Sequence, residues 1–166
     1  MPRKSHPFWR FSLRVYARTG VEQACLALQE AGADVNLLLF CCWQGSEGRT
    51  LNKRSLRKAM RAVAVWQQQV VQPLRHARRI IRRGLPGVPL EWGGSLRKDI
   101  LRVELDTEYV EQFVLMQHAA AVAQTMHKID PETIAAGNLT RYLELIGISY
   151  SAAIKRHAKV LSGAGG

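Results

Sequence analysis

The chain lacks the residue patterns that mark the better-known active sites and metal sites. Its three cysteines, Cys25, Cys41 and Cys42, are an odd number without CxxC or Cys/His spacing. They therefore indicate reduced thiols rather than a disulfide framework or a zinc site. The histidines form no ligand spacing, and neither Glu-x-x-His nor a glycine-rich phosphate loop occurs. From the sequence we assign no catalytic residue, no metal ion and no cofactor.

Long apolar runs are also missing. The most apolar one, Val35 to Trp43, has half the length that a membrane-spanning helix needs. In the basic amino-terminal segment, Arg10 and Arg14 interrupt what would be the apolar core of a signal peptide. We therefore expect a cytoplasmic protein without a membrane partner.

Acidic residues are absent from one long segment. Between Gly48 and Leu90 there is no Asp or Glu, whereas the rest of the chain has equal numbers of acidic and basic residues. The formal net charge of +11 therefore comes from eleven bases of this segment: Arg49, Lys53, Arg54, Arg57, Lys58, Arg61, Arg75, Arg78, Arg79, Arg82 and Arg83. Arginine dominates the set, and its planar guanidinium suits phosphate oxygens. This charge favours association with a polyanion.

The 166 residues, 47% of them hydrophobic, are expected to form a single domain over residues 1–162 with a flexible tail at 163–166. Helical periodicity and capping residues predict an all-α fold of about seven helices. The apolar segment 34–45 is expected to be a central buried helix, with a buried strand as the alternative. The other helices are expected at 7–18, from a Thr19 cap to Glu30, at 52–83, from Ser95 to about His127, from Asp130, from Asn138 to Gly147, and at 151–161.

The segment 52–83 combines an apolar stripe with many bases. The stripe consists of Leu56, Met60, Val63, Trp66, Val70, Leu74, Ala77 and Ile81. Pro73 removes a backbone hydrogen bond within it, so we expect a kink or a break at the proline. Because the stripe keeps its register across Pro73, one long kinked basic helix is favoured over two separate helices. On a regular helix the exposed side would carry Arg57, Arg61, Arg75, Arg79 and Arg82. The pattern predicts a basic helical face, unless its charges are merely solvated or neutralised within the molecule.

The stretch GLPGVPLEWGGS is expected to be a loop that ends at a Ser95 helix cap. Trp92 in this loop either stacks on a base, inserts into a partner or anchors the loop on the domain. The other tryptophans fall on apolar faces and are expected in the core: Trp9, Trp43 and Trp66. The helix after Ser95 is expected to have Leu96, Ile100, Val103, Val110, Val114 and Gln117 along one side, and a partly exposed acidic stripe of Glu104, Glu108 and Glu111.

The run FWRFSLRVYARTGVEQACLALQEAGADVNLLLFCCW and the later segment VWQQQVVQPLRHARR suggest a family. Over most of its length the chain resembles a family of short bacterial proteins known only as a conserved domain of unknown function. The resemblance implies a helical, cytosolic protein, and it supplies no site residue.

The residues favour a non-enzymatic cytosolic protein that uses its basic helical face on nucleic acid. Structured RNA or a ribosomal surface is favoured over a DNA operator, because no helix-turn-helix is recognisable. An adaptor or regulator that holds an acidic protein with the same face and Trp92 is the alternative. The third possibility is an enzyme whose site is assembled only in the folded chain.

Overall fold

The computed structural model describes residues 6–119 and 129–165, except the side chain of Leu90. The described residues form helices only: α1 (Pro7–Tyr16), α2 (Val21–Glu30), α3 (Val35–Ser46), α4 (Lys53–Trp66), the π-helix η1 (Gln67–Val71), α5 (Gln72–Arg83), α6 (Leu90–Ala119), α7 (Pro131–Leu145) and α8 (Ala152–Gly163). Because α4, η1 and α5 follow one another without a break, they count as one helix, and the described chain has seven. The prediction of an all-α fold of about seven helices is confirmed.

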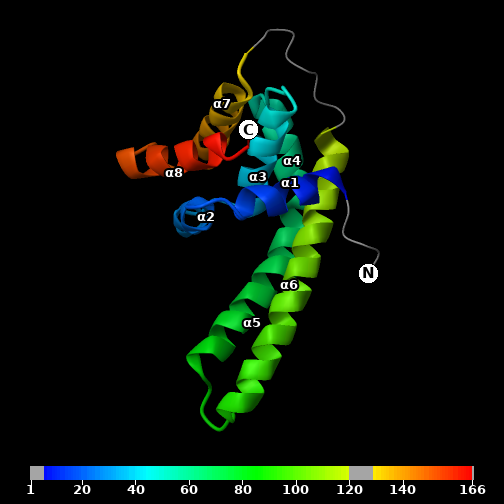
Figure 1. The fold of residues 1–166 in the computed structure, drawn as a ribbon. Helices are drawn as coiled ribbons and strands as arrows, with labels where there is room; N and C mark the ends of the chain where they lie inside the picture. Colours follow the sequence, from blue (N-terminus) through cyan, green and yellow to red (C-terminus); the bar gives the residue numbers. More distant parts are fainter. Residues whose placement is uncertain (1–5, 120–128, 166) are drawn as a thin grey trace.

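The helices form a body from which a helical hairpin projects. Figure 1 shows α1, α2, α3, α4, α7 and α8 gathered at one end, whereas α5 and the amino-terminal half of α6 run side by side away from them. We call this hairpin, residues 72–105, the arm. α6 is 30 residues long, which corresponds to about 45 Å at a rise of about 1.5 Å per residue. One helix therefore belongs to both the arm and the body.

The body is built around α3, as the apolar sequence of this segment predicts. Asp34 caps the helix, because its Oδ1 accepts hydrogen bonds from the backbone N–H groups of Asn36 (2.7 Å) and Leu37 (3.2 Å). Every residue from Asn36 to Gly45 is buried. The rings of Phe8 on α1 and Trp43 on α3 stack with centroids 4.9 Å apart. The central buried helix is confirmed, and the alternative of a buried strand is wrong.

Several predicted helix boundaries are wrong because Thr19 and Asn138, which were expected to cap helices, do not do so. Thr19 does not cap α2: the N-cap is Gly20, whose φ of +84° suits glycine, and no side chain caps the helix. Asn138 does not start a helix. It lies inside α7, where its side chain accepts from the N–H of Leu51 (2.7 Å) and donates to the carbonyls of Cys41 (3.2 Å) and Arg49 (3.0 Å). An asparagine that looks like a cap in the sequence thus ties α7 to the connection between α3 and α4.

The start of α6 and the carboxyl end of α8 also differ from the prediction. α6 starts at Leu90 rather than at Ser95, so Trp92 and the glycine pair after it lie in the first turns of the helix. Its predicted continuation to His127 lies outside the described residues. At the carboxyl end, Gly163 belongs to α8, and Ala164 and Gly165 are buried. The segment expected as a flexible tail therefore packs on the body as far as Gly165.

The helix that contains Pro73 is neither broken nor regular. It widens to a π-helix at residues 67–71, and the N–H of Gln72 donates to the carbonyl of Gln67, five residues earlier. Pro73 follows immediately and lacks the N–H that an α-helix needs there. A π turn contains one residue more than an α turn, so every residue after it is shifted by one position around the helix. The register of the apolar stripe therefore changes before the bases of α5.

Candidate nucleic-acid interface

The π turn moves two of the predicted surface arginines to the inner side of the arm. After η1, Val71 and Arg75 are buried and Arg78 is partly buried, whereas Leu74 and Ala77 of the predicted stripe are only partly buried. Arg75 is 9% exposed, in contrast to its predicted position on the basic face. The prediction for Arg75 is wrong because it assumed α-helical spacing throughout.

Glutamates of α6 neutralise both arginines. Arg75 donates from Nε to Glu104 (3.2 Å) and from a terminal nitrogen to Glu108 (2.6 Å). Arg78 donates to both oxygens of Glu104, at 2.5 and 3.1 Å. Intramolecular neutralisation, one of the alternatives for the basic segment, therefore applies to these two bases, and their binding of a polyanion stays a prediction.

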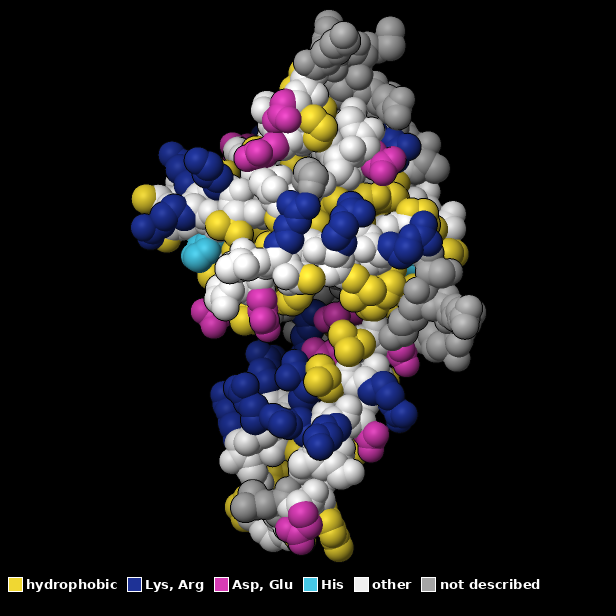
Figure 2. Space-filling model, in the orientation of Figure 1, with side chains coloured by type: hydrophobic (Ala, Val, Ile, Leu, Met, Phe, Trp, Pro, Cys, Tyr) yellow, Lys and Arg dark blue, Asp and Glu magenta, His cyan; other side chains and the backbone are white. Residues whose placement is uncertain are grey.

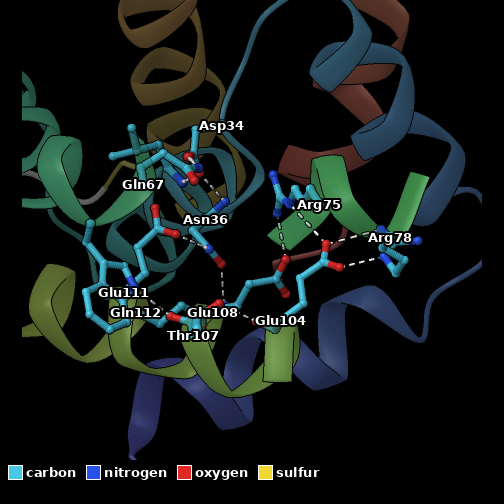
Figure 3. A network of polar contacts seen from close by, with 12 residues as sticks. Asp34, Asn36, Gln67, Arg75, Arg78, Glu104, Thr107, Glu108, Glu111 and Gln112 are labelled. Carbon is cyan, nitrogen blue, oxygen red and sulfur yellow. Dashed lines mark hydrogen bonds and ion pairs between the residues drawn. The ribbon is translucent and has the colours of Figure 1, made fainter. Parts of the chain in front are cut away.

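The buried side of α6 is polar where the arm joins the body. Figure 3 shows Glu111 and Gln112 of α6 facing Asn36 of α3, with Gln67 of η1 beside Asp34. The Asn36 side chain donates to Glu111 Oε2 (2.9 Å) and accepts from Gln112 Nε2 (2.8 Å), while Gln67 Nε2 donates to Asp34 Oδ2. A hydrogen-bonded network therefore takes the place of apolar packing between α3 and α6.

The glutamates of α6 consequently do not form the partly exposed stripe that their spacing suggested. Glu104 and Glu111 are buried, and Glu108 retains only partial exposure. Burial, and after it the nearby Asp34 carboxylate, raise the pKa of Glu111 to about 9. Burial also raises the pKa of Asp34. Conversely, Leu96 and Val103 are more than two-fifths exposed, although periodicity placed them on one apolar side. The apolar pattern did not predict the buried side of α6, because polar residues occupy much of that side.

Eight of the eleven predicted bases remain at the surface. They are Lys53, Arg54, Arg57, Lys58 and Arg61 on α4, and Arg79, Arg82 and Arg83 on α5. Arg49 is partly buried before α4. Within the part of the chain that the structure describes, none of the eight forms an ion pair. We call these eight residues the basic surface.

A second row of bases was not singled out by the sequence analysis. Figure 2 shows Lys and Arg side chains gathered on α5 and in a row across α1. The residues of α1 and its end are Arg10, Arg14 and Arg18, all exposed and spaced four apart, so they share one side of the helix. Arg14 lies over the ring of Phe11, and Arg18 donates to the carbonyl of Gly163 (3.4 Å). Their regular spacing was the available signal, but Glu22 and Glu30 of the following helix offset part of this charge in a count along the sequence.

The tryptophans divide into an inner set and one outer residue. Trp9 and Trp43 are buried, as expected for core positions, whereas Trp66 is partly buried and its indole N–H donates to the carbonyl of Thr107 (3.0 Å). Trp92 is 69% exposed in the first turn of α6. It is not an anchor that folds a loop onto the domain.

The described residues contain no arrangement typical of thiol or metal chemistry. The thiols of Cys25, Cys41 and Cys42 are all buried, and burial raises the pKa of Cys25 to about 12, so the reactive thiolate is disfavoured. No group of three or more potential metal ligands occurs among these residues. None of the helices described is long and apolar enough to cross a bilayer.

The fold and the exposed charges define an all-α protein with a projecting basic helical arm. Residues 7–115 match the family described as "Protein of unknown function (DUF2390)", and the chain belongs to this family. No curated protein and no solved structure matches the chain.

Proposed function

We propose that this protein is a cytoplasmic, non-enzymatic nucleic-acid-binding protein that contacts phosphates with its basic surface. The observation that carries the proposal is the set of eight exposed bases on α4 and α5, in a segment without a single acidic residue. Structured RNA or a ribosomal surface is the favoured target. The bases are spread along a helix and a projecting arm, which is an arrangement for contacts with a phosphate backbone rather than for reading bases.

The structure separates bases with an internal role from bases without one. Arg75 and Arg78 are paired with Glu104 and Glu108, so their charges stabilise the contact between α5 and α6. Arg79, Arg82 and Arg83 on the same helix have no acidic partner among the described residues and are exposed. Like charges at such short helical spacing repel each other, and a bound polyanion relieves this cost.

A triple substitution tests the proposal. Replacement of Arg79, Arg82 and Arg83 with Gln is expected to weaken RNA binding and to reduce the slope of log affinity against log salt by about 2, because each lost phosphate contact removes roughly 0.7 to 0.9. The folding stability is expected to change by only about 0.5 kcal/mol per site, as is usual for surface positions. Arg75 is left intact because it is buried, and its substitution would remove the ion-pair partner of Glu108 and one of the two partners of Glu104.

A matched control removes the same charge elsewhere. Lys155, Arg156 and Lys159 are exposed on α8, and their replacement with Gln is expected to leave affinity and salt slope unchanged. Equal losses in both triple variants would mean that only the net charge matters, which would contradict a binding site on the arm. Unchanged binding in the arm variant would contradict the proposal directly.

An acidic protein is the second candidate partner, and the exposed apolar residues Leu85 and Val88 beside the bases favour it. Affinity capture from lysate with and without nuclease distinguishes the two candidates. Loss of the captured material after nuclease treatment supports nucleic acid, whereas retention of one stoichiometric protein supports the adaptor.

A further inference from the structure

The tip of the arm displays an exposed aromatic ring. Trp92 has the highest exposure, 69%, among the large hydrophobic side chains that the structure describes. None of the hydrogen bonds and ring contacts of the described residues involves it. The ring is therefore accessible to a planar ligand.

Bases lie at the same end of the arm as this ring. The last turn of α5 carries Arg82 and Arg83, both exposed. A Cβ at Gly93 would lie 3.6 Å from Cγ2 of Ile81, so the first turn of α6 packs against the last turn of α5. Trp92 and the two arginines thus share the tip of the arm. Exposed aromatic rings and guanidinium groups at one site are the combination with which proteins hold unpaired nucleotides, through base stacking and phosphate contacts.

The charges decide between the possible occupants of the tip. A second copy of the chain would bring the same arginines of two arms together, which is unfavourable. A duplex offers phosphates but no free base face, because its bases are stacked on one another. A single strand, a bulge or a loop offers both a phosphate and an unstacked base.

We infer that the tip of the arm binds unpaired nucleotides, with a base stacked on Trp92 and the adjoining phosphates on Arg82 and Arg83. This inference rests on the proposed function and specifies its target: the looped or single-stranded parts of an RNA rather than its helical stems. The remaining bases of the basic surface then hold the neighbouring backbone.

The test compares three substitutions of Trp92 on two RNA probes, an oligouridine of roughly a dozen nucleotides and a perfect duplex of similar length. Trp92→Phe retains an aromatic face, Trp92→Leu retains an apolar side chain that does not stack, and Trp92→Ala removes both. Fluorescence anisotropy of the labelled oligouridine should show Trp92→Leu and Trp92→Ala weakened about fivefold to 150-fold, with Trp92→Phe close to the unchanged protein. Binding of the duplex should not respond to any of the three.

Phe113 provides a matched control. It is an aromatic residue of the same helix with 44% exposure, about 30 Å from Trp92 along the axis at about 1.5 Å per residue. Phe113→Leu is expected to leave oligouridine binding unchanged. Thermal unfolding of every variant is followed in parallel, and a Trp92→Leu or Trp92→Ala variant with normal unfolding and normal oligouridine affinity overturns the inference.

The outcomes separate this inference from the proposed function. Equal affinity of Trp92→Leu and the unchanged protein for oligouridine would mean that no base stacks there, while a flattened salt slope in the arginine triple variant would still support phosphate binding. A stronger effect of Trp92→Leu on vesicles of anionic phospholipid, or on an acidic protein, than on oligouridine would also overturn the inference. Failure of the unchanged protein to bind either RNA would contradict both proposals.

Discussion

Glu111 is a carboxyl group with no exposed surface in a network of amides and carboxyls. Asn36 donates to one of its oxygens, and the other oxygen, Oε1, has no hydrogen-bond partner among the described residues. Burial and the carboxylate of Asp34 raise the pKa of Glu111 to about 9. The neutral acid is therefore the form that the folded protein holds at neutral pH.

This raised pKa makes stability depend on pH in a defined direction. Between the ordinary glutamate pKa of about 4.3 and about pH 9, the folded chain binds the Glu111 proton more tightly than the unfolded chain does. The free energy of unfolding should therefore fall with rising pH in this window, by up to about 1.4 kcal/mol per pH unit from this one group. Urea denaturation at a series of pH values measures the effect.

Glu111→Gln mimics the neutral acid and still accepts from Asn36, so this variant should lose most of the pH dependence and be more stable than the unchanged protein at alkaline pH. Glu144→Gln, at an exposed position of α7, is the control and should retain the dependence. A Glu111→Gln variant with an unaltered pH profile would show that Glu111 is ionised in the folded protein.

At the scale of the elements, α3 and α7 approach each other more closely than side chains normally allow. A Cβ at Gly45 of α3 would lie 2.6 Å from the backbone of Ala135 on α7. This glycine is thus required by packing between two helices rather than by an unusual backbone angle.

Gly45→Ala is expected to destabilise the protein by about 1–3 kcal/mol, because overpacking outweighs the better helix propensity of alanine. Gly94→Ala on α6 is the matched control: its Cβ meets nothing within 4 Å, and it should stabilise the protein by up to about 1 kcal/mol. Chemical denaturation of both variants measures the difference. A Gly45→Ala variant as stable as Gly94→Ala would mean that α3 and α7 separate at no cost.

Across the whole molecule, helices of the body and of the arm differ in how many other helices pack against them. α3 packs against five other helices, whereas α5 packs against α6 and the π-helix. The arm therefore has one protein-facing side and a large solvated surface, which suits contact with an extended ligand.

This difference predicts two levels of local stability. Amides of α3 should exchange with solvent only through global unfolding, whereas those of residues 79–96 should exchange through local opening with a smaller free energy. Native-state hydrogen exchange measures both. Addition of oligouridine should slow exchange at the tip of the arm more than in α3, and equal protection of both regions in the free protein would contradict the two-level stability.

The sequence by itself determined the helical class, the buried central helix and the exposure of most bases on α4. These features depend on short-range periodicity and on caps such as Asp34, which act within a few residues. The sequence did not predict the π turn before Pro73. A proline shows that the regular backbone hydrogen bond is absent, but it does not show how the helix adapts to this loss.

Only the tertiary structure decided which charges are internal. Arg75 and Glu104 lie on different helices, and they meet because the π turn rotates one helix and the arm aligns the other beside it. The burial of Glu111 and the bonds of Asn138 likewise depend on partners far away in the sequence. Spacing along one helix gives a direction for each side chain, but its partner depends on which helix packs on that side, and that is decided by the fold as a whole.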